Sequence, residues 1–335
     1  MTGAVARART PATAALREIQ APVKGRLDDV VAEMRRIVAA ELPFIEQVSN
    51  HLLQMRGKMF RPTLALLSSA TTERSEDRVV TLAAVLELMH LASLVHDDSV
   101  DHSALRRGLP TVNSLFSHQV SVIMGDFLYS RALEALVTLG DLDLMRVLTG
   151  VSTQLTIGEM RQLAAVDALD FTDQDYEQLI QAKTASLLSA ACETGAMCGA
   201  NEHRQALRRY GERLGMAFQV ADDILDYTES SSTTGKPSGL DLKEHKVTLP
   251  LICALPRLSS KSRATVEALF AAESPSDAQV IEIIDLVARA GGIDDARRRG
   301  EQFAHDAEEA LADLPDTPAR TALTDAILYV MDRRS

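Results

Sequence analysis

The feature that most constrains this chain is a long interval without proline. None occurs between Pro110 and Pro237, and the interval is rich in Ala, Leu, Gln and Glu. Proline inside a helix removes a hydrogen bond and clashes with the preceding turn, so its absence permits long uninterrupted helices. Apolar residues also recur at helical spacing, as at Leu128, Ala132 and Leu136. We therefore predict an all-α protein.

The length of 335 residues suffices for one large domain or two ordinary ones. No shift in composition separates two halves, and no fixed-period repeat is visible. We predict a flexible tail over residues 1–12 and a single helical domain over residues 13–335. The most loop-like stretch runs from Thr228 to Gly239, and its polar composition is typical of a flap over a site.

The charge balance excludes some functions. Lys and Arg number 35 against 47 Asp and Glu, which gives a net charge of -12 and argues against a nucleic-acid surface. The cysteines (Cys192, Cys198 and Cys253) are odd in number and lack metal spacing, so neither a disulfide framework nor a zinc site is expected. The longest strongly apolar runs are too short for a transmembrane segment. We expect a cytoplasmic protein, with a peripheral position at a membrane left open.

Two acidic clusters of the form D-D-x-x-D lie inside apolar, helix-patterned sequence. The first is Asp97, Asp98 and Asp101, and the second is Asp222, Asp223 and Asp226. Residues four apart share a helix face, so like charges there repel, and neighbouring hydrophobes increase the cost. One such cluster is most simply a solvated helix turn or an N-cap. Two copies favour a hard cation, Mg²⁺, that takes carboxylate, water and phosphate oxygens.

Basic residues alternate with these clusters. Each alone is most simply a solvated charge, but together, in an acidic protein, they indicate a ligand that carries phosphates. They are Lys58, Arg61, Arg106, Arg107, Lys183, Lys236 and Lys246.

At this point the chain resembles a known family, the all-trans polyprenyl diphosphate synthases. The resemblance runs from about Gly57 to Lys246 and rests on seven strings in the family's order and spacing. These are GKMFRP, HLASLVHDDSVDHSALRRGLPTVN, GDFLYSRA, GEMRQL, KTASLL, QVADDILDY and GKPSGLDLKEHKVTLP.

The resemblance implies a single bundle of long helices around a deep central cavity, usually in a homodimer. It also implies three Mg²⁺ ions on an allylic diphosphate, with Asp97, Asp98, Asp101 and Asp222 as ligands. By position in the motif, Asp223 and Asp226 would support the metals through water.

The resemblance further assigns the two substrates. Isopentenyl diphosphate would be held by Lys58, Arg61, His90 and Arg107. The allylic diphosphate would be held by Arg106, Lys183, Lys236 and Lys246, and Thr184 and Gln219 would lie beside the carbocation.

Two positions depart from the family pattern. His245 stands where the family commonly has glycine, which would alter the turn near Lys246 or add a phosphate donor. Ser99 replaces a usual aliphatic residue inside the first acidic cluster.

The implied reaction is head-to-tail prenyl transfer, an electrostatic task that needs no nucleophilic side chain. The product tail would run along the first acidic helix, and a residue five positions before Asp97 lies about 7 Å below it. Ala92 and Ser93 are small there, which predicts a product of about thirty carbons or more, with Met89 one turn deeper. Alternatively Ala92 is simple helix packing, and Phe127 or Leu128 forms the floor.

Four other functions remain as alternatives. They are a short-chain farnesyl or geranylgeranyl diphosphate synthase, a terpene cyclase, a non-catalytic subunit of a two-component synthase and a helical scaffold. The intact second acidic cluster and the early Gly57-Lys58 string oppose a cyclase. A non-catalytic subunit would be expected to lose the acidic clusters, and a scaffold leaves the ordered cations unexplained.

Overall fold

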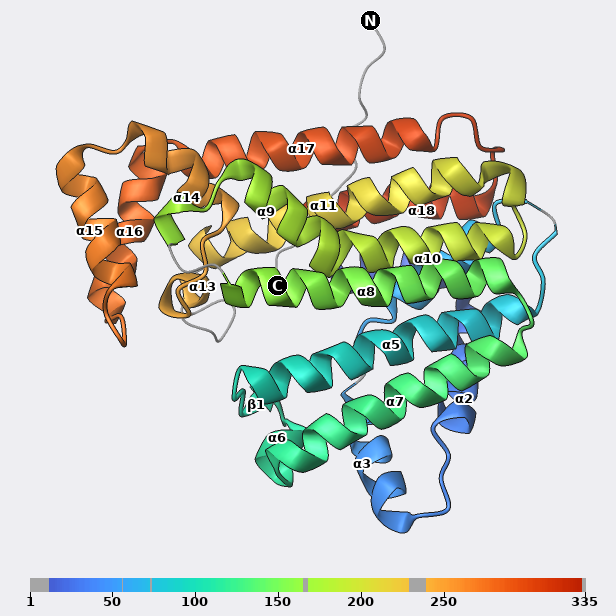
Figure 1. Cartoon of the computed structure of the whole chain (residues 1–335). Coiled ribbons are helices and arrows are strands. Elements are labelled where there is room, and N and C mark those ends of the chain that lie inside the picture. The colour runs from blue at the N-terminus through green and yellow to red at the C-terminus, as the bar shows by residue number, and fades with distance from the viewer. Residues whose placement is uncertain (1–11, 56, 73, 165–167, 229–238, 333–335) are drawn as a thin grey trace, which may run out of the picture.

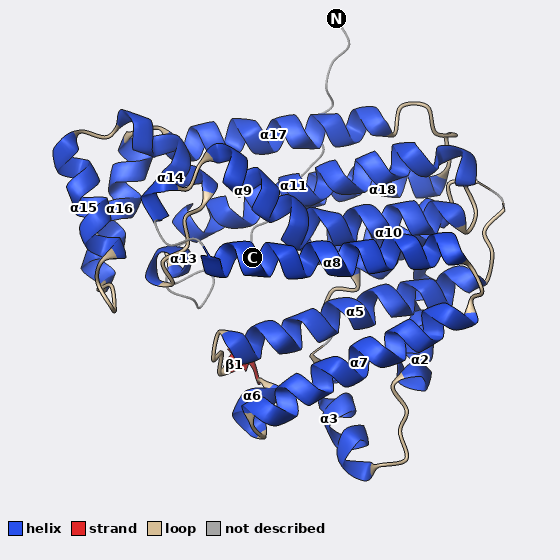
Figure 2. Cartoon of the chain, in the orientation of Figure 1, coloured by secondary structure: helices blue, strands red, loops and turns tan. Residues whose placement is uncertain are grey.

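The structure is a computed structural model that describes residues 12–55, 57–72, 74–164, 168–228 and 239–332 (Figure 1). In these ranges almost all regular structure is helical, which confirms the all-α prediction (Figure 2). The predicted tail lies outside the described residues except for Ala12, which begins the first helix.

The N-terminal half carries the helices that flank the first acidic cluster. They are α1 (Ala12–Gln20), η1 (Ala21–Val23), α2 (Lys24–Ile37), α3 (Pro43–Gln54), α4 (Phe60–Ser69), α5 (Arg78–Val100), α6 (Val112–Leu115), α7 (His118–Thr138) and α8 (Leu142–Ala164). A short antiparallel pair, β1 (Leu105–Arg106) and β2 (Leu109–Pro110), follows α5.

The C-terminal half carries the second acidic cluster and covers the bundle. Its elements are η2 (Ala168–Asp170), α9 (Asp173–Ile180), η3 (Gln181–Ala185), α10 (Ser186–Met197), η4 (Asn201–His203), α11 (Arg204–Thr228), α13 (Leu240–Lys243), α14 (Leu249–Ala254), η5 (Leu255–Arg257), α15 (Ser260–Phe270), α16 (Asp277–Arg289), α17 (Gly292–Ala310) and α18 (Pro318–Met331).

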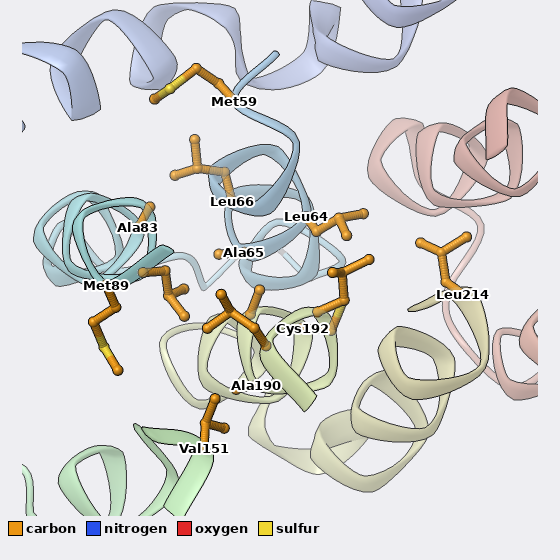
Figure 3. Packing of buried hydrophobic residues seen from close by; sticks show 14 of the residues in the cluster. Met59, Leu64, Ala65, Leu66, Ala83, Met89, Val151, Ala190, Cys192 and Leu214 are labelled. Atoms are coloured by element: carbon orange, nitrogen blue, oxygen red, sulfur yellow. The ribbon is translucent and has the colours of Figure 1, made fainter. Parts of the chain in front are cut away.

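Helix α10 lies at the centre of the main hydrophobic core, where it packs against α4 and α11 (Figure 3). The helices approach closely because glycine faces the neighbouring backbone. A Cβ added at Gly195 would lie 2.2 Å from the carbonyl oxygen of Ala65, and one at Gly215 would lie 2.5 Å from the Cα of Ala185. Such contacts leave little room for the helices to shift, because protein interiors are closely packed.

A second, smaller core lies under α14, α15 and α16, the orange helices at one end of the molecule in Figure 1. Its buried members include Val266, Leu269 and Ile283. Val247, in the connection between α13 and α14, packs against both cores. The two cores are thus joined beside the segment that carries Lys246.

Helix α5 has the length and apolarity of a membrane span, with 67% of its most apolar window buried inside the protein. It packs mainly against α7, and it also contacts α2 and α4. Its last turn carries Asp97 and Asp98. Since its apolar surface is covered by protein, α5 is a core helix that delivers carboxylates to the end of the bundle.

Candidate active site

A cavity of about 670 Å³ lies where the two acidic clusters meet. Asp101 from the end of α5 and Asp223 from the end of α11 both line it, although 122 positions separate them in the sequence. The other lining residues are Gln162, Leu163, Phe171, Tyr176, Leu179, Ile180, Lys183, Thr184, Gln219, Asp241, Glu244, His245, Lys246, Val247 and Thr248.

The first acidic cluster occupies the last turn of α5. Burial, followed by the charge of Glu159, raises the pKa of Asp97 to about 6. Asp98 is 3% exposed, and both of its carboxylate oxygens accept hydrogen bonds of 2.8 Å from Nε of Arg106. Asp98 therefore holds Arg106, whereas Asp101 lines the cavity.

The short β pair explains how Arg106 reaches Asp98. Residues 105–110 form a tight hairpin in which Arg106 pairs with Leu109. Its two central residues, Arg107 and Gly108, have φ angles of 53° and 77°, as tight hairpin turns require. The sequence did not predict this hairpin, since strands of two residues leave no alternating pattern.

The second acidic cluster lies in the last turns of α11, and Asp223 is its buried member. The Tyr176 hydroxyl donates to Asp223 over 2.6 Å, and the Gln219 amide donates over 2.9 Å. Burial nevertheless raises the pKa of Asp223 to about 7. The Thr184 hydroxyl donates to Gln219 over 2.7 Å, so one hydrogen-bonded chain joins this aspartate to the predicted carbocation site.

Asp226 has a different task from Asp223. Its carboxylate accepts the backbone N–H groups of Leu240 and Asp241, each over 3.0 Å. These are the first N–H groups of α13, so Asp226 caps that short helix from α11. The contact ties the start of α13 to the end of α11 and sets the place of Asp241.

Lys183 and Thr184 lie in η3, a π-helical turn between α9 and α10. The Lys183 ammonium contacts Glu159 and Gln162 of α8, each over 2.7 Å. Isolated π turns are frequent at functional sites because the extra residue redirects side chains. Lys183 and Thr184 both line the cavity as a result.

Lys246 also lines the cavity, and its ammonium lies 2.6 Å from Glu244. The remaining predicted ligand of the allylic diphosphate, Lys236, lies outside the described residues.

The predicted residues for isopentenyl diphosphate gather at the start of α4. Arg107 donates to the carbonyl oxygen of Met55 over 2.7 Å, and its guanidinium packs against Gly57, where any Cβ would collide with it. The Lys58 ammonium lies 5.7 Å from the ring centre of Tyr329 in α18. Tyr329 thus brings the C-terminal helix to this group.

Buried charge surrounds Arg61 of α4. Burial lowers its pKa to about 10, and the charge of Glu87 opposes that shift. Glu87 is 5% exposed, and burial raises its pKa. Nε of Arg61 and Oε2 of Glu87 are buried without a hydrogen-bond partner in the described part of the chain. His90 lies one turn after Glu87, and burial together with Arg61 and Arg107 holds its pKa well below the usual 6.5.

Sequence reasoning missed four polar residues, three around the cavity and one beside Arg61. Tyr176 and Glu159 are single residues in helical sequence whose partners are distant, so no local signal marks them. Asp241 stands in the string GLDLKEHK, whose match to the family was the available signal. Burial, followed by the charge of Asp226, raises the pKa of Asp241 to about 6. Glu87 is a charged residue inside an apolar run, and this pattern could have identified it from the sequence.

The residues predicted to set product length lie outside the cavity lining. Ala92 is 2% exposed and Met89 is 3% exposed, both in the main core. Ser93 is partly buried, and its hydroxyl donates to the carbonyl oxygen of His90. Their role in product length stays a prediction, since the described cavity does not reach them.

Comparisons with known proteins identify the family of this chain. The sequence profile of the polyprenyl synthetase family matches residues 42–287. The chain is 37% identical over 298 residues to an all-trans-nonaprenyl-diphosphate synthase (geranyl-diphosphate specific) of Rhodobacter capsulatus, covering 88% of this chain and 91% of that one. The protein therefore belongs to the polyprenyl synthetase family.

Solved structures agree with this assignment. A decaprenyl diphosphate synthase from Rhodobacter capsulatus superposes with a TM-score of 0.90 at 34% identity, covering 95% of this chain and 98% of that one. A polyprenyl synthase from Caulobacter crescentus, solved with calcium and isoprenyl diphosphate, gives 0.89 at 32% identity, covering 96% and 98%. The predicted all-α isoprenoid synthase fold is confirmed.

The low pKa of His90 gives a testable pH dependence. In the folded protein His90 stays neutral, whereas in the unfolded chain it takes up a proton below about pH 6.5. The unfolded state then binds one more proton at His90, so the stability that neutral His90 contributes is full above pH 6.5 and is lost as the pH falls below it. His90→Gln should abolish up to about 1.4 kcal/mol of this loss per pH unit.

The measurement is the free energy of unfolding in urea at pH 7.5, 6.5 and 5.5, without substrate or metal. His305→Gln, at an exposed position of α17, is the matched control and should follow the wild type. Parallel pH dependence of wild type and His90→Gln would contradict the buried neutral state.

Proposed function

We propose that this protein makes a long all-trans polyprenyl diphosphate by Mg²⁺-dependent, head-to-tail condensation of an allylic diphosphate with isopentenyl diphosphate. As a polyprenyl synthetase it is a prenyltransferase. The observation that carries the proposal is one cavity lined by a member of each acidic cluster, Asp101 and Asp223, together with Lys183 and Lys246. Relatives named for nonaprenyl and decaprenyl products support the long product over a short one.

The carboxylates fit a hard divalent cation. Around the cavity acidic groups outnumber basic ones, and the raised pKa values of Asp97 and Asp241 reflect burial without sufficient neutralising charge. A diphosphate would be repelled here unless cations came with it. Asp97, Asp101 and Asp222 would hold Mg²⁺, three ions in all, and the ions would supply Lewis-acid stabilisation of the leaving diphosphate.

The remaining polar residues would bind and orient the substrates. Lys183, Lys246 and Arg106 would neutralise the allylic diphosphate, with Lys236 from the segment outside the described residues. Thr184 and Gln219 would face the developing carbocation with fixed dipoles. Phe171, Ile180 and Val247 give the cavity an apolar wall that excludes water from the cation.

Isopentenyl diphosphate would bind without metal, through the positive charges of Lys58, Arg61 and Arg107. Neutral His90 would be a hydrogen-bond partner. The allylic carbon–oxygen bond breaks, and its electron pair leaves with the diphosphate oxygen. The double bond of isopentenyl diphosphate then forms the new carbon–carbon bond, and a proton leaves to the departed diphosphate. No side chain of the protein is consumed.

A homodimer is part of the proposal. Apolar side chains are exposed on two consecutive long helices, including Ile123 of α7 (64% exposed) and Met160 of α8 (60% exposed). We take these exposed apolar side chains as the contact with a second copy of the chain. We also propose a cytoplasmic location, with a peripheral position at a membrane when the product is very apolar.

The direct test supplies purified protein with Mg²⁺, isopentenyl diphosphate and geranyl, farnesyl or geranylgeranyl diphosphate, and sizes the products. Asp101→Asn should reduce turnover at least about 100-fold, since it removes a charge that acts on the leaving diphosphate. Asp313→Asn, on an exposed surface position, is the matched control. Activity should disappear with a chelator and return with Mg²⁺.

Two outcomes would reject the proposal. Absence of elongation with every primer would favour the non-catalytic subunit, and a cyclic hydrocarbon product would favour the cyclase. Full activity in the presence of a chelator would reject the metal.

Ala92→Phe tests the course of the product tail. If the tail passes α5 at this depth, the larger side chain should shorten the main product by at least one five-carbon unit. Because overpacking of a core costs about 1–3 kcal/mol, the melting temperature is measured in parallel. Val137→Phe, on the exposed face of α7, should leave the product unchanged. An unchanged product from a folded, active Ala92→Phe protein would place the floor elsewhere.

Light scattering tests the homodimer. The wild type should have twice the mass of one chain, and the double variant Ile123→Glu with Met160→Glu should shift toward the mass of one chain, because charges in an apolar contact are costly to desolvate. Leu328→Glu, an exposed apolar position of α18, should leave the mass unchanged. A monomeric wild type would contradict the proposal.

A further inference from the structure

The turn between α13 and α14 places five consecutive residues, 244–248, on the cavity wall. His245 stands at its sharpest point, with a φ of 56°. This left-handed conformation is unfavourable for any residue with a Cβ, and glycine normally occupies it. A histidine there suggests that its side chain has a task.

The backbone of the turn is a complete helix cap. The N–H of His245 bonds to the carbonyl of Leu242 over 3.2 Å, and the N–H of Lys246 bonds to that of Asp241 over 2.8 Å. This pair of bonds is the Schellman motif, in which the residue after the cap is left-handed. Glycine would satisfy this cap without strain, so the cap by itself does not explain histidine.

The imidazole of His245 reaches outside the turn. Its Nε2 lies 2.9 Å from the carbonyl oxygen of Ala272, in the turn after α15. Because a carbonyl can only accept, Nε2 carries the hydrogen and is occupied. The ring also packs 6.0 Å from the ring of Phe270, the last residue of α15. Nε2 is therefore not left over as a phosphate donor, and the backbone of the turn keeps the left-handed cap that glycine would give.

The contact links the cavity wall to the smaller core. α15 is anchored there by Val266 and Leu269, and α16 by Ile283. Val247, two residues after His245, packs against both cores. Lys246 is thus held between a side chain fixed to Ala272 and a side chain fixed in both cores. Its long side chain starts from a backbone that cannot easily move.

We propose that His245 is a positioning residue that braces the turn carrying Lys246 against the connection between α15 and α16. This inference rests on the proposed role of Lys246 toward the allylic diphosphate. The orange helix pair in Figure 1, remote from the acidic clusters in sequence, supports the active site through this hydrogen bond together with the Lys243–Asp277 ion pair between α13 and α16.

The variant His245→Gly separates the effect of the backbone conformation from the effect of the side chain. Glycine keeps the left-handed turn and removes the brace. We expect the KM for the allylic diphosphate to rise about three- to tenfold, the range given by loss of one net hydrogen bond. The KM for isopentenyl diphosphate should stay within about twofold, because that substrate contacts other residues. The melting temperature should remain near that of the wild type, since relief of strain offsets the lost bond.

His245→Ala and His305→Ala complete the comparison. His245→Ala removes the brace and keeps the strain, so it should show the same rise in KM with a lower melting temperature. His305→Ala, at an exposed position, should match the wild type in both substrates. In the full chain without ligands, amide hydrogens of residues 241–247 should exchange faster in His245→Gly than in the wild type.

Three outcomes would overturn the inference. They are wild-type KM values in His245→Gly, an equal rise for both substrates, and unchanged or slower amide exchange. A wild-type protein that elongates no primer would instead reject the proposed function, and the exchange measurement would still decide whether the brace exists.

Discussion

The structure depends on gathering carboxylates at the end of an apolar bundle, where water cannot fully screen them. Asp97, Asp223 and Asp241 all have pKa values raised to about 6 or 7, mainly by burial. Such charges repel one another and would force the ends of α5 and α11 apart if the helices could move. The proposed Mg²⁺ would relieve this repulsion. Until then the packing of the bundle must resist it.

That resistance comes from the close approach of α4, α10 and α11. Gly195 lets α10 contact the backbone of α4, and Gly215 lets α11 contact η3. The second contact also serves the site, because it places Thr184 within 2.7 Å of Gln219. The same geometry that fixes the helices therefore fixes the hydrogen-bonded chain to Asp223. Stability and chemistry share these contacts.

The sequence predicted the helices and the residue types of the site, because spacing on a helix is a local property. It could not predict how the aspartates divide their work. Asp98 holds Arg106 and Asp226 caps α13, and both partners are set by turns between helices. The π turn at Lys183 was also unpredictable, since one extra residue in a helix leaves no change in composition. Tyr176 has no motif of its own, because its importance comes only from Asp223.

The two predicted diphosphate sites differ in their charge, and this difference affects how a product diphosphate would move from one site to the other. Around Lys58, Arg61 and Arg107 the main acidic counter-charge among the described residues is Glu87, so an anion gains attraction there without metal. Around Lys183 and Lys246 the carboxylates dominate, and each lysine contacts a glutamate. A diphosphate must displace those glutamates or arrive with cations. An elongated product, whose diphosphate begins in the basic site, would therefore need fresh neutralisation to move into the acidic one. The excess of carboxylates would thereby make the proposed Mg²⁺ a condition for every further cycle of elongation.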